Sequence, residues 1–313
     1  MEILPLAYDS FGVRSMCTLV SFKNLKIMID PGVALGPTRY GLKPTKEELR
    51  ALELCKKQVM KISKLTNVAI VTHYHYDHHP YPQDEEMYKE CFSNKIVLAK
   101  DINKNINFSG KRRGKIFEGK IKNLATSLEY ADEREFEFNN VRISFSPAVW
   151  HGDVGSKVGR VIMVFIKSGN DSFLFGSDAQ SLADPLALKW VKEKNPKFLI
   201  VDGYPTIFIG WRLGEKLFEA AKGNLKEAIE AIDANQIILD HHIVRDIEYK
   251  ERMKDVFEVA KRLNKKINTA AEFLGIEDFF LEAWRKEIYE KKRKIDVDTY
   301  FKKFSEKVSL KSG

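Results

Sequence analysis

The sequence predicts an α/β protein with mixed β-sheets. Residues 18–22 and 26–30 alternate apolar and polar side chains around a turn at Asn24, which indicates a hairpin. Residues 68–72 form an apolar run without polar alternation, which is typical of a buried central strand. Farther along the chain, short strand-like runs are interrupted by helical segments. This mixture favours sheets with both parallel and antiparallel strands.

The elements follow one another in a regular order. A loop rich in Gly and Pro at residues 33–44 leads to Thr45-Lys-Glu-Glu48, a capping box that begins an amphipathic helix over 46–64. The remaining strands are predicted over 96–99, 141–147, 158–166, 172–176, 198–202 and 236–239. The remaining helices are predicted over 84–92, 182–193, 214–233, 248–263 and a charged segment at 281–307. The basic segment 104–122 lacks long apolar runs, so a surface loop or hairpin is predicted there.

Composition limits the classes of protein that fit. The chain has 313 residues, 44% of them hydrophobic, which is enough for a full core. Its net charge, 52 − 44 = +8, favours anionic partners. The three cysteines, Cys17, Cys55 and Cys91, are far apart, so neither a disulfide framework nor a Cys-x-x-Cys metal site is expected.

The same features predict where the protein works. Few cysteines fit a reducing, cytoplasmic location. The acidic N-terminus and the short apolar run at 161–166 predict no secretion signal and no membrane segment. Lys and Glu are abundant and Gln is scarce, a composition typical of proteins from hot environments.

The seven histidines fall at only three places, each at the end of a predicted strand. They are His73, His75, His78 and His79; His151; and His241 and His242. Alternate residues of an extended loop point the same way, so His73 and His75 are able to hold one metal ion through imidazole nitrogens. A turn after them lets Asp77 and His78 face a second ion. The clustering therefore predicts a metal site.

The segment His73-Tyr-His75-Tyr-Asp77-His78 resembles the His-x-His-x-Asp-His signature of the metallo-beta-lactamase superfamily. Other marks of that superfamily occur in order: Asp30 closes an early strand, and His151, Asp178 and the His241-His242 pair each follow later strands. Within the superfamily, Thr-His-Tyr-His-Tyr-Asp-His-His and Leu-Asp-His-His resemble an uncharacterised, largely archaeal group of predicted metallohydrolases. The resemblance covers about residues 10 to 245.

The resemblance implies a four-layer αβ/βα sandwich of two mixed sheets flanked by helices. It places a metallo-beta-lactamase-like domain at 1–280 and leaves 281–313 as a charged helical extension packed on it. It implies that His73, His75 and His151 hold one metal ion and that Asp77, His78 and the last histidine hold another. Asp178 is expected to bridge the two ions, and Asp77 and Asp178 are expected to be the catalytic carboxylates.

The roles of four residues, His241, His242, Asp30 and His79, need a choice. Adjacent residues on a strand face opposite ways, so only one of His241 and His242 is expected to bind metal. His241 is preferred as the first residue past the apolar strand. Asp30 is expected to hold a ligand histidine rather than a metal ion. His79 is surplus to the signature and is expected to orient a ligand, to donate a proton to the leaving group or to make structural hydrogen bonds.

The resemblance implies a binuclear hydrolase that attacks its substrate with a hydroxide bridging two divalent ions. Zinc is favoured by the imidazole-rich set, with manganese and iron as alternatives. The chain supplies every ligand of the signature, which disfavours a non-catalytic metal-binding or regulatory module. A di-iron redox protein is the third interpretation; such proteins usually replace one ligand histidine with a carboxylate.

The positive charge predicts a small anionic substrate resembling a phosphate ester. Tyr204, Arg212 and Arg245, near predicted strand ends, are candidate substrate-binding residues, and Asp202 begins the segment that contains Tyr204 and Arg212. Nucleic acid is a weaker alternative partner, because the gap of 241 − 178 = 63 residues is too short for the inserted domain of nucleic-acid-processing members. The apolar stripe in the C-terminal helix fits packing on the body or contacts in a homo-oligomer.

Overall fold

The computed structural model describes residues 1–312 and divides into two compact units. Unit 1 comprises residues 1–99, 112–130 and 270–312, and unit 2 comprises residues 100–111 and 131–269. Gly313, the last residue of the predicted extension over 281–313, lies outside the described residues. Each unit contains one large mixed sheet with helices, which confirms the predicted α/β class with two mixed sheets.

The sheet of unit 1 joins an antiparallel half to a parallel half. Its order is β1 (Glu2–Tyr8), β2 (Met16–Phe22), β3 (Leu25–Ile29), β4 (Val68–Val71), β5 (Ile96–Ala99) and β6 (Ser127–Tyr130). β1 to β3 pair antiparallel, and β3 to β6 pair parallel. A 3-10 turn at Asp9–Phe11 follows β1. β1 is absent from the predicted strands because nearly all of its residues are buried, so it lacks polar alternation.

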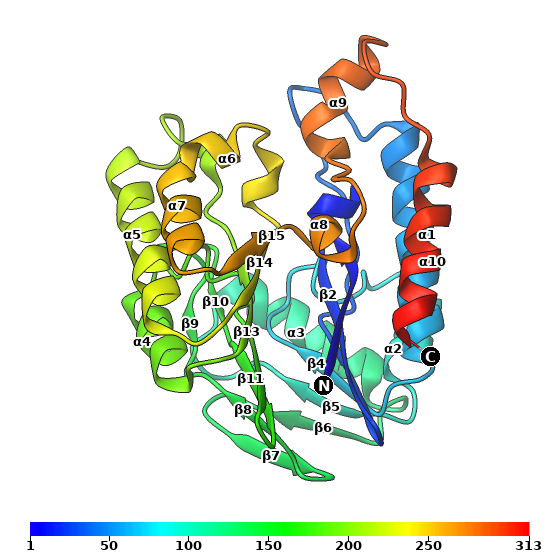
Figure 1. The fold of residues 1–313 in the computed structure, drawn as a ribbon. Helices are drawn as coiled ribbons and strands as arrows, with labels where there is room; N and C mark the ends of the chain where they lie inside the picture. Colours follow the sequence, from blue (N-terminus) through cyan, green and yellow to red (C-terminus); the bar gives the residue numbers. More distant parts are fainter. Residues whose placement is uncertain (313) are drawn as a thin grey trace. The chain divides into compact units, whose positions relative to one another are not determined.

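The helices of unit 1 flank this sheet. They are α1 (Lys46–Ser63), α2 (Glu85–Phe92), most of α3 (Phe108–Ile121), α8 (Ala270–Leu274), α9 (Leu281–Tyr289) and α10 (Val297–Ser312). α1 begins at the predicted capping box and lies beside α10 (Figure 1). The single helix predicted over 281–307 is wrong. The chain leaves helical geometry after Tyr289, with Lys291 in the left-handed region, and Asp296 then caps α10 through Thr299.

The loop predicted over residues 104–122 is also wrong, because most of this segment is helix α3. Its buried positions are Gly110, Gly114, Phe117 and Ile121, at the spacing of one helical face. Two of these four residues are glycines, so the buried face carries few apolar side chains. The basic residues occupy the other faces, and this hides the helical pattern in the sequence.

The sheet of unit 2 is also mixed. Its order is β15 (Lys266–Asn268), β14 (Gln236–Asp240), β13 (Phe198–Asp202), β12 (Asp171–Phe175), β11 (Val164–Ser168), β8 (Val141–Phe145) and β7 (Glu135–Phe138). β12 to β15 pair parallel, and the other neighbours pair antiparallel. A separate two-stranded sheet pairs β9 (Val149–Trp150) with β10 (Arg160–Val161). The strand predicted over 158–166 is therefore two short strands in different sheets.

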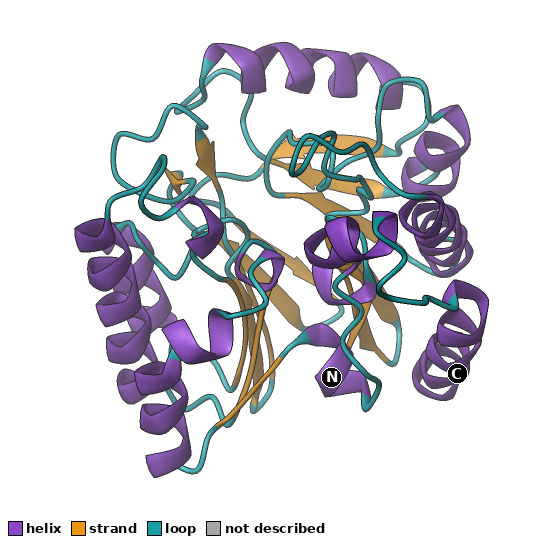
Figure 2. Cartoon of the chain, turned by 90° about the horizontal axis from the view of Figure 1, so that it is seen from above, coloured by secondary structure: helices purple, strands orange, loops and turns teal. Residues whose placement is uncertain are grey.

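The helices of unit 2 gather along one side of its sheet (Figures 1 and 2). They are α4 (Pro185–Lys194), α5 (Glu215–Ala231), α6 (Tyr249–Arg252) and α7 (Lys254–Arg262), with 3-10 turns at Thr206–Phe208 and Ile243–Arg245. α5 packs against both α4 and α7. The helix predicted over 248–263 divides at Met253 into α6 and α7. Among the described residues, no helix combines the length and the apolar character that crossing a bilayer requires.

Parallel strands bring the polar residues that follow them to one edge of a sheet. In unit 1, Asp30 follows β3 and the loop 72–79 follows β4. In unit 2, Asp178 lies just beyond β12, Asp202 ends β13 and His241 follows β14. The register pairs Asp202 directly with Asp240, so these two strands end level with each other.

A buried ion pair ties the C-terminal segment to the rest of unit 1. Arg285 of α9 is fully buried and donates to both carboxylate oxygens of Glu48, at 2.7 and 2.9 Å. It also donates to the backbone oxygens of Leu42 and Gly36. Because Glu48 also completes the capping box with Thr45, its side chain both fixes the start of α1 and binds Arg285 of α9.

We predict that Arg285→Ala lowers the free energy of unfolding by about 3–5 kcal/mol, because it leaves the Glu48 carboxylate buried without its counter-ion. Lys286→Ala is the matched control; Lys286 is exposed and touches Glu290 only at 4.0 Å, so a change within about 0.5 kcal/mol is expected. Denaturant unfolding of both variants measures the difference. Equal stabilities of the two variants would show that this ion pair does not hold the C-terminal segment.

Candidate metal centre

The loop after β4 carries the donors of unit 1. β4 is wholly buried, and the chain then turns back on itself, with the amides of His78 and His79 both donating to the carbonyl of His75. This turn lets His73, His75 and His78 approach one another: the ring centroids of His73 and His78 are 4.0 Å apart. The structure thus brings together three predicted ligand histidines from six residues of chain.

His73 and His75 present nitrogens to a common point. Nε2 of His73 and Nδ1 of His75 lie 3.0 Å apart, and the rings are nearly perpendicular. Two imidazole nitrogens bound to one tetrahedral zinc ion at about 2.1 Å would lie roughly 3.4 Å apart. This spacing and the donor chemistry fit a shared ion. Asp77, also a predicted ligand, is half-exposed in the same loop.

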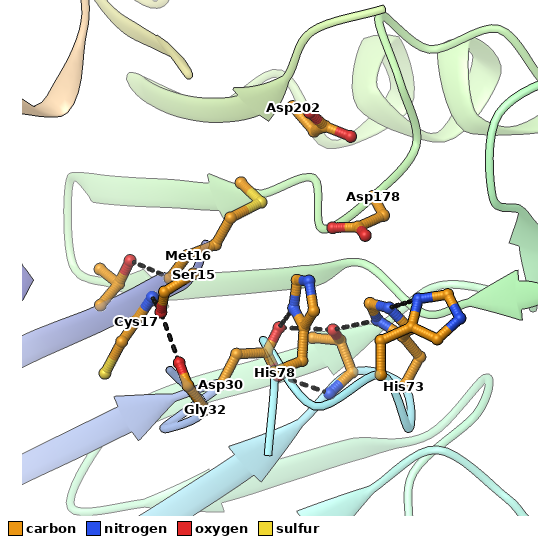
Figure 3. Close-up of polar contacts among 12 residues, drawn as sticks. Ser15, Met16, Cys17, Asp30, Gly32, His73, His78, Asp178 and Asp202 are labelled. Atoms are coloured by element: carbon orange, nitrogen blue, oxygen red, sulfur yellow. Dashed lines mark hydrogen bonds and ion pairs between the residues drawn. The ribbon is translucent and has the colours of Figure 1, made fainter. Parts of the chain in front are cut away.

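Asp30 anchors the loop from below (Figure 3). Its carboxylate is fully buried and accepts from the backbone N–H of Thr72 at 2.8 Å, from the Thr72 hydroxyl at 2.6 Å and from Nδ1 of His78 at 2.7 Å. Burial raises the pKa of Asp30, and the bonds from His78 and Thr72 oppose that rise. With its proton on Nδ1, His78 carries its lone pair on Nε2, the tautomer that suits metal binding.

The chain after Asp30 packs tightly under the same loop. A Cβ on Gly32 would lie 2.3 Å from the backbone nitrogen of His79, so no larger residue fits there without moving the loop. The hydroxyl of Ser15 donates to the Gly32 carbonyl at 2.6 Å and fixes this approach (Figure 3). The end of β3 therefore determines where the histidine loop can lie.

His79 differs from its neighbours. Its ring is buried among the rings of Tyr74, Tyr76 and Phe117, and Nδ1 lies 3.3 Å from the Tyr88 hydroxyl. Nε2 has no hydrogen-bond partner among the described residues. Burial lowers the pKa of His79 to about 3, so the ring is neutral. The structure places this residue in an aromatic cluster.

The donors of unit 2 surround Asp178. This carboxylate is fully buried in a loop whose unusual path puts four nearby residues, Ser177, Gln180, Ser181 and Leu182, in the left-handed region. One Asp178 oxygen lies 2.9 Å from Nε2 of His151 and 3.6 Å from Nε2 of His241. Gln180 from the same loop lies 3.3 Å from Nδ1 of His151. Two predicted ligand histidines thus face the predicted bridging carboxylate.

His241 and His242 point their rings to different partners. β14 ends abruptly, because His241 takes a positive φ of 66° and its N–H donates to the Asp240 carboxylate. The guanidinium of Arg245 lies 3.4 Å from both ring nitrogens of His241. Asp202 accepts from the backbone N–H of His242 at 2.9 Å and from its Nδ1 at 2.8 Å. The donor atoms of both histidines nevertheless lie within 4.8 Å of the Asp178 donor.

Asp202 is the main residue that the sequence analysis undervalues. It is fully buried, and burial raises its pKa well above the ordinary value. The sequence predicts it as the last residue of a strand, beside the candidate substrate residue Tyr204, and gives it no role in holding a histidine. The signal was nevertheless present: Asp202 ends its strand as Asp30 does, and both carboxylates accept from Nδ1 of a histidine.

The three candidate substrate residues lie in different surroundings. Tyr204 is fully buried and its hydroxyl donates to Asp153 at 2.8 Å. Arg245 is buried beside His241. Arg212 is exposed, with its guanidinium 4.1 Å from the ring centroid of Trp211.

The donor sets of both units fit divalent metal ions. Each unit offers imidazole nitrogens with carboxylate oxygens close by, which is the chemistry of zinc and related metals in proteins. In each unit a buried carboxylate also fixes the Nδ1 of one histidine, as is usual around metal sites.

Comparison with solved structures shows proteins of similar fold. CmlA, a diiron beta-hydroxylase from Streptomyces venezuelae, matches with a TM-score of 0.52 at 12% identity, over 86% of this chain and 52% of its own. Unliganded yeast PDE1 matches with a TM-score of 0.50 at 14% identity, over 86% of this chain and 96% of its own. YhfI from Bacillus subtilis, a metallo-beta-lactamase fold protein, has a TM-score of 0.48 at 12% identity, over 85% of this chain and 91% of its own.

Comparison of sequences gives the family. No family model matches the chain. The UPF0282 protein of Thermococcus gammatolerans is 41% identical over 96% of this chain and 99% of its own length. The UPF0282 protein of Korarchaeum cryptofilum is 41% identical over 93% of this chain and 95% of its own. These archaeal relatives confirm the archaeal group predicted from the histidine motifs, and the chain belongs to the UPF0282 family.

Proposed function

We propose that this protein is a metal-dependent hydrolase with two divalent ions. The observation that carries the proposal is the buried Asp178 carboxylate, one oxygen of which faces Nε2 of both His151 and His241. A buried carboxylate surrounded by imidazoles is the donor chemistry of a shared metal ligand. The histidine loop of unit 1 offers a second set of donors of the same kind.

The proposed ligand assignment follows the superfamily resemblance. His73, His75 and His151 would hold one ion, and Asp77, His78 and His241 would hold the other, with Asp178 binding both. Zinc is the proposed metal because imidazole dominates the set. When bound, such ions polarise the substrate oxygen and lower the pKa of water toward neutrality.

The chain's own residues have supporting tasks. Asp30 holds Nδ1 of His78 and keeps Nε2 available in the right tautomer. Gln180 positions His151 by its contact with Nδ1. The aromatic cluster around His79 fixes the base of the histidine loop. These contacts would keep each donor in place before metal arrives.

No cysteine competes as a nucleophile. Cys17, Cys55 and Cys91 are all fully buried. Burial raises the pKa of each thiol, that of Cys91 to about 12, so the reactive thiolate is scarce at neutral pH. This supports attack by water rather than a covalent intermediate on a cysteine.

The proposal predicts about two zinc or manganese ions per purified chain by mass spectrometry. It also predicts turnover of bis-(p-nitrophenyl) phosphate that is lost on chelation and returns when metal is added back. Unaltered turnover in metal-free protein, or no bound metal, would contradict it. Iron without turnover would favour the redox alternative, and bound metal without turnover on any ester would favour a non-catalytic module.

Paired variants test the ligand choice at the end of β14. His241 is proposed because its Nε2 faces Asp178. His242 is the competing ligand, because the Asp202 carboxylate holds Nδ1 of His242 and leaves its Nε2 for a metal ion. We predict that His241→Ala loses one of the two ions, while His242→Ala keeps both with about 10- to 100-fold weaker affinity. Metal titration of both variants, checked for folding by circular dichroism, measures this. The reverse pattern would assign the ligand to His242, and equal retention would exclude both assignments.

A further inference from the structure

One arginine of unit 1 combines partial burial with the lack of a polar partner among the described residues. Arg113 of α3 is half-buried, yet it makes no hydrogen bond or ion pair with any described residue, and its Nε is fully buried. By contrast, Arg285 donates to Glu48, and Arg14 and Arg39 both contact Glu282. A buried N–H group without a hydrogen-bond acceptor is costly. Arg113 therefore has unused donors for a ligand.

Arg113 is held next to the histidine loop. One turn farther along α3, Phe117 packs its ring against the rings of Tyr74 and His79, at centroid distances of 5.7 and 5.5 Å. Phe117 also contacts Phe92 of α2. These apolar contacts fix α3 on the loop, so the position of Arg113 is set by the core of unit 1 rather than by a flexible surface.

The neighbours of Arg113 define an aromatic and polar surface. Its guanidinium carbon lies 5.7 Å from the ring centroid of Tyr76, which stacks on Tyr81 at 4.3 Å. Asp77 follows Tyr76 in the chain and belongs to the same loop. All of these side chains are half-exposed, so a bound molecule can reach them. Burial lowers the pKa of Arg113, but an arginine remains charged at neutral pH.

We infer that Arg113 binds an anionic oxygen group of the substrate, of the phosphate class, beside Asp77. A guanidinium presents paired N–H donors that match phosphate oxygens, and partial desolvation strengthens such bonds. The inference rests on the proposed hydrolase for its biological meaning and gives that site a specificity residue. It also gives Arg113, one of the basic residues at 111–115, a specific role in addition to any contribution to solubility.

The test compares Arg113→Gln with Arg112→Gln in the metal-loaded protein. The two variants remove the same charge from adjacent positions of one helix, but Arg112 is exposed. Binding of inorganic phosphate is measured by calorimetry, and metal content is measured alongside. We expect about 10- to 100-fold weaker phosphate binding for Arg113→Gln, less than about two-fold for Arg112→Gln, and two ions in both. Arg113→Lys should restore binding only partly.

Kinetics separate this inference from the proposed function. With a phosphodiester substrate, Arg113→Gln should raise KM by a similar factor, while Arg112→Gln should change KM by less than about two-fold. Active protein whose phosphate affinity is the same in both variants would overturn the role of Arg113 and leave the hydrolase standing. If the protein has no hydrolase activity and only Arg113→Gln loses phosphate binding, the proposed hydrolase would be overturned and the anion site would stand. Equal losses of phosphate affinity in both variants would show that only the overall positive charge of the helix matters. That result would also overturn the inference.

Discussion

The carboxylates buried at the ends of two strands are the constraint on which both donor sets depend. Asp30 after β3 and Asp202 at the end of β13 each accept a hydrogen bond from Nδ1 of a histidine. A buried carboxylate is unfavourable unless its oxygens are bonded. Each strand end is therefore stable only when its histidine segment is in place, and this couples the sheet edge to the orientation of the imidazoles.

This coupling explains how loops with unusual backbone conformations can still hold their side chains in fixed positions. The loop around Asp178 uses several residues in the left-handed region, and His241 leaves its strand with a positive φ. Such conformations cost free energy and persist only where the surroundings fix them. In unit 1 the tight contact at Gly32 and the aromatic packing of Phe117 have the same effect on the histidine loop.

The sequence predicts the strands near the site well because their signals are local. β4, β13 and β14 are apolar runs that stop at a polar residue, and within each sheet parallel pairing carries such residues to one edge of that sheet. β1 escapes prediction because burial on both faces removes alternation, and α3 escapes because glycines occupy half of its buried positions. The hydrogen bonds of Asp202 and the contacts of Arg113 could not be predicted, because they depend on residues distant in sequence, which periodicity does not reveal.

The orientation of His78 by Asp30 is the central claim, and metal-loaded crystals test it most directly. Anomalous diffraction at the zinc edge would locate the ions independently of the protein density. We predict an ion about 2.1 Å from Nε2 of His78, with Nδ1 still bonded to Asp30. An ion on Nδ1 of His78, or no anomalous peak beside the loop 73–78, would contradict it.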